Sequence, residues 1–221
     1  MSNNVELVGI TQPTVKLEDK CLTPEEFIVY IARVSNPDNQ LNTQTSAKLI
    51  NYLIKHNHWS PFEHVYITYK IKTSRAIAAQ ILRHRSFTFQ EFSQRYASST
   101  SLENIEWRLQ GKTNRQVGDE EVNLEKITSI RISNLLKKLE KEYNNLINFG
   151  VAKECARMIL PLCTSTSLYM TGSLRSWIHY IKIRNTKDTQ KEHRNIANDV
   201  QMDLKNYFPN VFVALAESNL K

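Results

Sequence analysis

Residues 83–96 read Arg83-His84-Arg85-Ser86-Phe87-Thr88-Phe89-Gln90-Glu91-Phe92-Ser93-Gln94-Arg95-Tyr96. Three Arg and one His stand here among four aromatic rings. Consecutive residues point apart on a helix, so three adjacent basic residues cannot share one helix face and a helix must end near here. Arg offers a planar fork of donors, so the arrangement fits a diphosphate or two phosphates on two ligands. A solvated basic loop is the alternative interpretation.

The second half of the stretch alternates in a regular way. Glu91, Ser93 and Arg95 are two residues apart. Side chains at this spacing line one face of an extended segment. We therefore expect an extended segment that presents all three side chains to the same ligand.

The spacing also resembles a family motif: Arg-His-Arg, seven residues, then Ser-x-Arg, with a Glu two residues before the Ser. This is the defining motif of the flavin-dependent thymidylate synthases, which are unrelated to the thymidylate synthases that use a cysteine nucleophile. The one departure is Gln90, where many members carry Asn, and both residues are amides. The resemblance implies an α+β fold, an antiparallel sheet with long helices; the chain has no Rossmann glycine motif.

Length and charge set broad limits on the protein. The 221 residues can bury a sizeable core, so we expect one domain spanning residues 1–221. The formal net charge is +7, from 29 basic and 22 acidic residues. This excess favours acidic partners, either nucleic acid or phosphorylated small molecules.

Cysteine usage and apolar runs indicate the compartment. Cys21, Cys155 and Cys163 are odd in number and lack the Cys-x-x-Cys spacing, so we expect a reducing compartment and no structural metal. The first residues lack a charged start followed by an apolar segment, and no apolar run approaches the ~20 residues that span a bilayer. We expect a cytoplasmic protein without a membrane partner.

Hydrophobic spacing predicts the order of strands and helices. Expected strands cover residues 5–14, at a sheet edge, 65–71 and 164–171. A long polar loop is expected at 97–118. Expected helices cover residues 24–35, 45–55, 75–84, 119–148, 151–160, 174–184 and 189–208. The helix at 119–148 is amphipathic, and its charged face is interpreted as a solvated surface or a subunit contact.

A group of histidines follows the second helix. His56, His58 and His64 lie within nine residues, near Glu63. They could ligate zinc, or they could complement the dipole at the end of the helix. The same stretch resembles the family block His-x-x-(Ser/Thr)-Pro-Phe-Glu-His, which implies flavin contacts from His58 and Ser60.

Two further positions point to a nucleotide. Gln80, Arg83 and His84 stand at i, i+3 and i+4, so they share one helix face, and a Gln amide can read a pyrimidine edge because it both donates and accepts. Arg157 stands among apolar residues and needs an anionic partner if it is buried. Its block resembles the family segment Ala-Arg-x-x-Leu-Pro, where the Arg holds the substrate nucleotide.

The last matching blocks surround the helix at 174–184. Arg175 and His179 share a face, and Arg184 is at the end. Ser173 and His179 replace the Asn that the family often has at two flavin contacts. Gln190 and Glu192 match the family's Gln-x-Glu.

The resemblance implies the reaction as well. dUMP is methylated to dTMP, with a methylene group from methylenetetrahydrofolate and hydride from FAD that NADPH reduces. A fixed positive charge beside N3 and O2 of uracil would stabilise the anion that develops on the ring, and the family's catalytic Arg matches Arg184. The implied flavin contacts are His58, Ser60, Arg83, His84, Arg85, Glu91, Ser173, Arg175 and His179. The implied substrate contacts are Gln80, Arg83, Glu91, Ser93, Gln94, Arg95, Arg157 and Arg184.

The family also implies a homotetramer whose sites are shared between neighbouring subunits. Three other interpretations stand beside this one. Ser93 could be a nucleophile, although no adjacent base is apparent in the sequence. A nucleic-acid-binding module could stack bases on Phe87, Phe89, Phe92 and Tyr96. Against it, we expect the basic residues of this chain to be dispersed and buried, whereas such a module arranges them in a stripe. A zinc hydrolase could use His56, His58 and His64.

Overall fold

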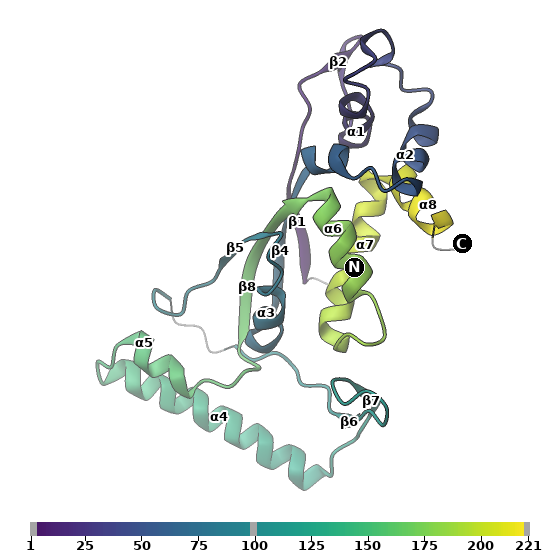
Figure 1. The fold of residues 1–221 in the computed structure, drawn as a ribbon. Coiled ribbons are helices and arrows are strands. Elements are labelled where there is room, and N and C mark those ends of the chain that lie inside the picture. The colour runs from purple at the N-terminus through teal and green to yellow at the C-terminus, as the bar shows by residue number, and fades with distance from the viewer. Residues whose placement is uncertain (1–3, 98–100, 219–221) are drawn as a thin grey trace.

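The computed structural model describes residues 4–97 and 101–218 and is built on a four-stranded antiparallel sheet in the order β1-β4-β8-β5 (Figure 1). The predicted α+β fold is therefore confirmed, and β1 lies at an edge of the sheet as expected. The strands are β1 (Val5–Ile10), β4 (Tyr66–Ser74), β5 (Thr88–Glu91) and β8 (Ser165–Ser173).

The central pair, β4 and β8, positions the rest of the molecule. The two nine-residue strands pair along their whole length, from Tyr66 opposite Ser173 to Ser74 opposite Ser165. Ile67, Tyr69 and Ile71 are fully buried on one face, which is the alternation that the sequence predicts for residues 65–71. The strand runs three residues further, to Ser74, because pairing with β8 continues there.

Each central strand continues directly into a helix. Ser74 begins α3 (Arg75–Ile81), where its hydroxyl accepts the amide of Ile77, and Ser173 begins α6 (Leu174–Arg184), where its hydroxyl accepts the amide of Ser176. Both hydroxyls satisfy backbone donors that a helix start leaves free. The strands are antiparallel, so these helices start from opposite ends of the central pair.

The remaining helices complete the core and one end of the molecule. α7 (Lys191–Tyr207) contacts both α3 and α6, while α1 (Pro24–Ala32), α2 (Ser46–Lys55) and α8 (Pro209–Ser218) gather at the end opposite α4 (Figure 1). The start of α1 is a capping box, with reciprocal bonds between Thr23 and Glu26. The predicted last helix ends near residue 208, but α8 was not predicted; Pro209 starts it at the first helical position.

One predicted helix begins too early. Residues 118–121 form β7 (Gly118–Glu121), which pairs with β6 (Arg108–Gln110) inside the predicted loop, and α4 spans only Lys126–Asn148. The amide of Val122 bonds to the carbonyl of Trp107 on the hairpin. This cross-strand pairing prevents the helix from starting at residue 119.

The other short elements are two-residue strands and single turns of helix. These short elements are β2 (Lys16–Leu17), β3 (Lys20–Cys21), η1 (Pro37–Asn39), η2 (Ser60–His64), α5 (Lys153–Ala156) and η3 (Arg157–Ile159). The helix predicted at 151–160 is therefore broken into two elements, α5 and η3. No helix within residues 4–97 and 101–218 is long and apolar enough to cross a membrane.

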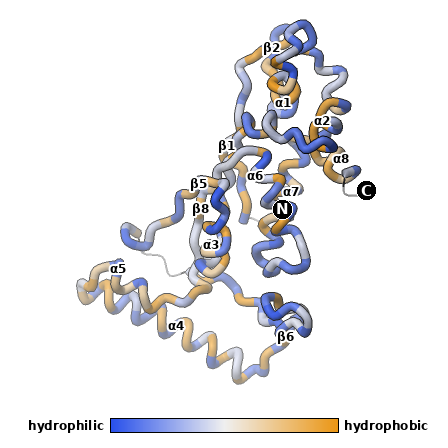
Figure 2. The backbone as a smooth tube through the Cα atoms, viewed as in Figure 1, coloured by the Kyte–Doolittle hydropathy of each residue, from blue (hydrophilic) through white to orange (hydrophobic). Residues whose placement is uncertain are grey.

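The long helix α4 lies away from the sheet with α5 beside it (Figure 1). Hydrophobic residues occur along its length (Figure 2), yet Tyr143 alone of its residues is buried. Ile127 is 71% exposed and Leu135 57%. This face is therefore apolar and largely uncovered by the described part of the chain.

One glycine decides how the loop after α3 packs. Gly172 lies on β8 beneath Phe87, and a Cβ atom at this position would stand 2.5 Å from the Phe87 ring. The Phe87 ring packs in turn against Trp177, with centroids 4.8 Å apart. The absence of a side chain at residue 172 therefore lets the loop that carries Phe87 settle on the sheet.

Candidate active site

The C-terminal ends of α3 and α6 meet at a pair of side chains. Nε of Arg184 donates a hydrogen bond to Nε2 of His84 at 2.9 Å. A guanidinium can only donate, so Nε2 of His84 accepts and the proton of the neutral ring lies on Nδ1. Burial lowers the pKa of His84 to about 4, and the charges of Arg184 and His179 add to the shift. His84 is therefore neutral near pH 7 and orients Arg184.

Aromatic rings fix the position of His84. Its ring lies 5.0 Å from the ring of Tyr180, which is fully buried, and 6.4 Å from that of Phe87, in both cases edge to face. Such pairs add about 0.5–1.5 kcal/mol beyond the area they bury. The imidazole that orients Arg184 is thus itself held by the core.

A second histidine, the fully buried His193, lies beside the half-buried His84, with ring centroids 6.1 Å apart. Its Nε2 is 3.1 Å from the hydroxyl of Tyr180 and its Nδ1 is 3.3 Å from Oε1 of Gln80. Burial lowers the pKa of His193 to about 3, with Arg184 and His84 adding to the shift, and burial raises the pKa of Tyr180. Both groups are neutral near pH 7. We call Gln80, His84, Tyr180, Arg184 and His193 the inner cluster.

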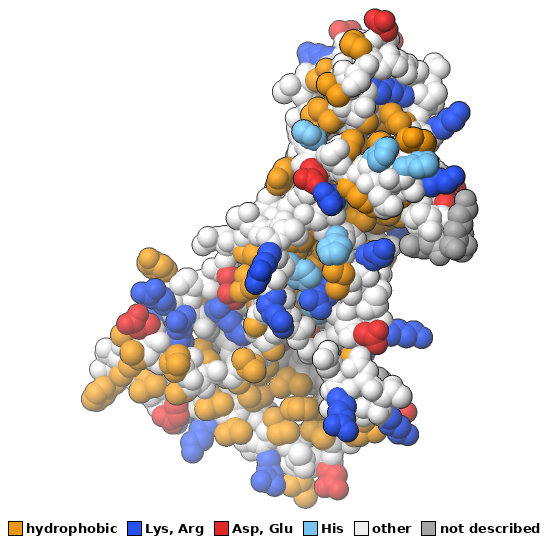
Figure 3. Space-filling view, in the orientation of Figure 1, with side chains coloured by type: hydrophobic (Ala, Val, Ile, Leu, Met, Phe, Trp, Pro, Cys, Tyr) orange, Lys and Arg blue, Asp and Glu red, His pale blue; other side chains and the backbone are white. Residues whose placement is uncertain are grey.

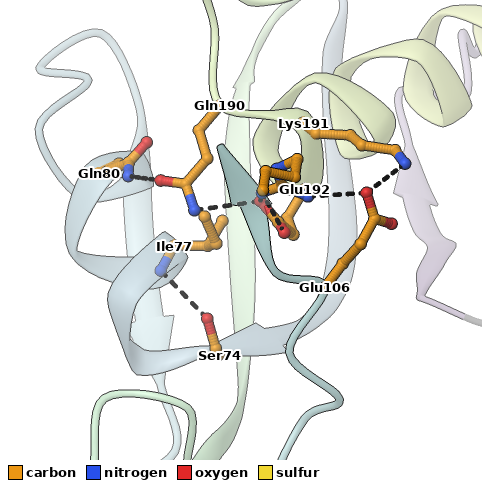
Figure 4. Close-up of polar contacts among 8 residues, drawn as sticks. Ser74, Ile77, Gln80, Glu106, Gln190, Lys191 and Glu192 are labelled. Atoms are coloured by element: carbon orange, nitrogen blue, oxygen red, sulfur yellow. Dashed lines mark hydrogen bonds and ion pairs between the residues drawn. The ribbon is translucent and has the colours of Figure 1, made fainter. Parts of the chain in front are cut away.

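The polar contacts continue from the inner cluster to the start of α7 (Figure 4). Nε2 of Gln80 donates to Oε1 of Gln190 at 2.7 Å, and Nε2 of Gln190 donates to Oε2 of Glu192 at 3.0 Å. Arg108 from β6 binds both oxygens of Glu192, at 2.6 and 2.9 Å. The hydrogen-bond chain Tyr180–His193–Gln80–Gln190–Glu192 thus joins three helices and ends on a paired carboxylate.

Three arginines of the quoted stretch, Arg83, Arg85 and Arg95, are exposed, and we call them the outer arginines. Within residues 4–97 and 101–218, the side chains of Arg83 and Arg85 have no ion pair or hydrogen bond, and Arg95 has only a 3.4 Å pair with the exposed Glu154. The expectation that the basic residues are buried is therefore wrong for these three. Blue and pale blue side chains gather over the middle of the face seen in Figure 3.

The predicted common face of Glu91, Ser93 and Arg95 is also wrong. β5 ends at Glu91, and the amide of Ala97 folds back to the carbonyl of Ser93. Glu91 turns inward, where Arg75 donates to it at 2.8 Å and Thr166 at 3.0 Å. The segment stops being extended because pairing with β8 stops.

An open groove runs beside α6 and between α2 and α8, with a volume of about 1340 Å³. Three predicted flavin contacts, Ser173, Arg175 and His179, line it, and Arg175 pairs with Glu63 across it. The hydroxyl of Ser173 is already used to cap α6. Lys55, Lys182 and Lys205 add positive charge to the walls.

Two other predicted flavin contacts lie near this groove but do not line it. His58 and Ser60 are exposed in the turn after α2, where the ring of His58 packs near that of Tyr52, 5.9 Å away. The zinc alternative gains no support here, because no three His, Cys, Asp or Glu side chains in the described ranges are placed to hold a metal.

Comparison with known proteins decides the family. Residues 16–210 match the family model described as thymidylate synthase complementing protein. A probable flavin-dependent thymidylate synthase of Paramecium bursaria Chlorella virus 1 is 45% identical over 96% of this chain and 98% of the relative. The flavin-dependent thymidylate synthase of Synechocystis sp. is 44% identical over 96% of this chain and 99% of the relative. This chain belongs to the flavin-dependent thymidylate synthase family.

The fold agrees with this assignment. The crystal structure of the UMP/dUMP methylase PolB from Streptomyces cacaoi, bound with 5-Br dUMP, superposes with a TM-score of 0.77 over 96% of this chain and 94% of that one. The two sequences are 22% identical, so this likeness shows a shared fold. The resemblance seen in the sequence is confirmed: the chain is an enzyme of the flavin-dependent thymidylate synthase family.

The structure groups only some of the residues that the family motifs predict. Gln80, His84 and Arg184 come together in the inner cluster. Arg157 is half-buried on η3, and its Nε is buried without a partner among the described residues. Gln94 is buried, and Ser93 accepts the amide of Arg95. The predicted contacts of this flavin-dependent thymidylate synthase thus include buried, half-buried and exposed side chains.

Sequence reasoning missed four residues that hold this site: Arg75, Arg108, Tyr180 and His193. One of them left a signal. His193 stands on the apolar stripe of α7 that continues through Ile196, Val200 and Leu204, and a histidine on a buried stripe must find polar partners. Arg108 gave no signal in the sequence, because it lies on a strand in a segment that was expected to be a loop.

Proposed function

We propose that this chain converts dUMP to dTMP with a methylene group from methylenetetrahydrofolate and with FAD that NADPH reduces. The observation that carries the proposal is the orientation of Arg184 by a neutral His84. The ring of His84 lies beside that of His193, which bonds to the amide of Gln80. Relatives named flavin-dependent thymidylate synthases, at 44–45% identity, support it.

Arg184 is the proposed catalytic residue. When C5 of uracil is activated, negative charge develops on the O4–N3–O2 system, and a fixed cation stabilises this charge more in the transition state than in the ground state. His84 accepts from Nε of Arg184, which leaves the terminal nitrogens of the guanidinium free to face the ring. The neutral imidazole fixes this orientation without cancelling the charge.

The groove beside α6 fits a flavin dinucleotide. Its volume of about 1340 Å³ exceeds that of ordinary small-molecule pockets, about 300–1,000 Å³. Arg175 and Lys182 would pair with the diphosphate, and His179 would contact the flavin. The bound flavin supplies hydride chemistry, while the protein supplies position and charge.

The outer arginines are the proposed phosphate contacts of dUMP and of the cofactor. Their side chains are exposed, and two of them have no partner within the described residues. A guanidinium fork binds phosphate oxygens in pairs. Arg157, whose Nε lacks a partner among those residues, is proposed to complete the substrate site.

We further propose a cytoplasmic homotetramer with shared sites. Arg83, Arg85 and the Nε of Arg157 have no partner within the described residues, so a neighbouring copy would supply the remaining contacts. The apolar face of α4, with Ile127, Ile130 and Leu135 exposed, supplies a surface that a second copy can cover. Free thiols at Cys21, Cys155 and Cys163 agree with a reducing compartment.

The test is to purify the protein, record its absorption spectrum and measure dTMP formation from dUMP, omitting methylenetetrahydrofolate or NADPH in turn. We expect a yellow protein whose activity requires both. Arg184→Ala should keep the flavin spectrum and lose turnover by about 100-fold or more. Ser93→Ala should keep most turnover. A colourless protein without dTMP formation, or normal turnover of Arg184→Ala, would contradict the proposal.

A further inference from the structure

The hydrogen-bond chain from Tyr180 to Glu192 has a direction. A hydroxyl, an imidazole and an amide can each donate and accept, so the first four members could be connected in either sense. The carboxylate of Glu192 can only accept. The direction of the whole chain is therefore set at this end.

The direction follows step by step from Glu192. Its Oε2 requires the Nε2 of Gln190, which is 3.0 Å away, so Oε1 of Gln190 faces Gln80. That oxygen requires the Nε2 of Gln80, at 2.7 Å, so Oε1 of Gln80 faces His193. Nδ1 of His193 must then carry the proton, and Nε2 accepts from the hydroxyl of Tyr180.

Arg108 holds Glu192 in place. It donates to both carboxylate oxygens, at 2.6 and 2.9 Å, and its own side chain is 11% exposed, while that of Glu192 is 37% exposed. Glu106 also binds Arg108, at 3.1 Å, and binds Lys191, at 2.5 Å, but it makes no bond to either glutamine. The two carboxylates share one arginine, and Glu192 alone of the two reaches the chain of amides.

We propose that Glu192 is a positioning residue that determines which end of the Gln80 amide faces the pyrimidine, and hence the preference for uracil over cytosine. This inference rests on the proposed function, in which Gln80 reads the base. Gln80 keeps one N–H and one lone pair free after its two bonds. Uracil offers a donor at N3 and an acceptor at O4, whereas cytosine offers the reverse pattern, so a reversed amide would suit the wrong base.

The substitution Glu192→Gln tests the inference directly. The new amide has the same shape. Arg108 makes its shorter bond, 2.6 Å, at the Oε1 position, so the amide oxygen takes that position and the NH₂ group takes the Oε2 position that faces Gln190. The amides of Gln190 and Gln80 and the proton on His193 then reverse in turn. Glu106→Gln is the matched control, because it removes one negative charge from the same arginine and leaves the chain intact. The Kd values of dUMP and dCMP are measured for the flavin-loaded wild-type protein and both variants.

We expect Glu192→Gln to lower the ratio of dUMP to dCMP affinity by about tenfold, the scale of one misplaced hydrogen bond. Glu106→Gln should keep the wild-type ratio. Equal ratios in wild type and Glu192→Gln would overturn the inference while leaving the proposed function standing. A wild-type protein that bound neither nucleotide would overturn the proposed function, and the inference with it.

A second measurement needs no substrate. Nitrogen NMR of protein labelled at histidine reports which ring nitrogen of His193 carries the proton. We expect Nδ1–H in the wild type and in Glu106→Gln, and Nε2–H in Glu192→Gln. A role of Glu192 in stability alone would not move this proton, and a wild-type ring protonated on Nε2 would overturn the assigned direction.

Discussion

The inner cluster and the outer arginines differ in how their polar groups are satisfied, although Gln80 and His84 of the inner cluster are sequence neighbours of Arg83 and Arg85. Each member of the inner cluster has a partner from the same chain, and Arg184 is held at 2.9 Å from His84. Arg83 and Arg85 have none within the described residues. One chain alone thus holds the proposed catalytic charge in place, while the proposed phosphate contacts have no fixed partner within the described residues.

The largest effect should follow from removing the core beneath the inner cluster. Trp177 is fully buried, contacts Tyr69 and Phe87, and donates to the carbonyl of Ile67 at 3.1 Å. Trp177→Ala should lower the free energy of unfolding by about 3–5 kcal/mol, measured by urea denaturation. Trp107, which is 39% exposed, is the control, and Trp107→Ala should cost about 1 kcal/mol or less. Equal losses would show that the inner cluster does not depend on this core.

The next effect separates charge from orientation at Arg184. Arg184→Lys keeps the positive charge but loses the Nε bond to His84. Loss of one charged hydrogen bond corresponds to about 1.5–3 kcal/mol, so kcat should fall on the order of tenfold to a hundredfold. The flavin absorption spectrum is the control for a loaded site. A lysine variant with wild-type kcat would show that orientation by His84 is not needed.

Acid should weaken the inner cluster. The pKa values of His84 and His193 are lowered to about 4 and about 3, so the unfolded chain takes up protons first as the pH falls below about 6.5. Stability from the two neutral rings is complete above that pH and is lost as the pH falls toward 4. Urea denaturation at pH 7.5 and pH 5 should show this loss.

His193→Asn isolates one ring in that experiment. The variant should lose less stability than the wild type between pH 7.5 and pH 5, because one titrating group is gone. Between pH 8.5 and pH 7.5 both proteins should show the same change, which serves as the control. An identical acid loss in the two proteins would contradict the lowered pKa of His193.

The smallest effect on stability belongs to the outer arginines. Arg83→Ala should change the free energy of unfolding by less than about 0.5 kcal/mol, because no bond within the described residues is lost. Arg33 is the contrasting control: it is 8% exposed and bonds to Asn39, Asn42 and Thr45, so Arg33→Ala should cost about 2–3 kcal/mol. The Arg83 variant should nonetheless bind dUMP more weakly by calorimetry. Unchanged binding would exclude Arg83 from the phosphate site.

Local patterns predicted those parts of the fold that depend on nearby residues. Alternating apolar residues predicted β4, and the helices expected from residues 75 and 174 begin where α3 and α6 begin. Residues 118–121 were predicted as helix because their state depends on pairing with β6, far from any local signal. Pairing with a distant strand therefore determined the secondary structure of this segment, and the local spacing of apolar residues did not.

The site shows the same division. The spacing predicted Gln80 and His84 on one face of a helix at 75–84, but α3 ends at Ile81, so His84 lies beyond the helix. His84 bonds to Arg184, and Gln80 joins the cluster through His193. The family motif predicted Glu91 and Arg95 as joint contacts, but the first turns inward to Arg75 and the second outward. Sequence separation cannot tell where a strand stops, and that stop decides which way each side chain points.

Gly172 limits how this enzyme can change over generations. Every single-base change of a glycine codon that yields another amino acid adds a Cβ atom, and this atom would meet the ring of Phe87 at 2.5 Å. A descendant lineage could alter residue 172 only after residue 87 had become smaller, so the order of the two mutations is constrained. Substitutions at residues 172 and 87 are therefore expected to depend on each other.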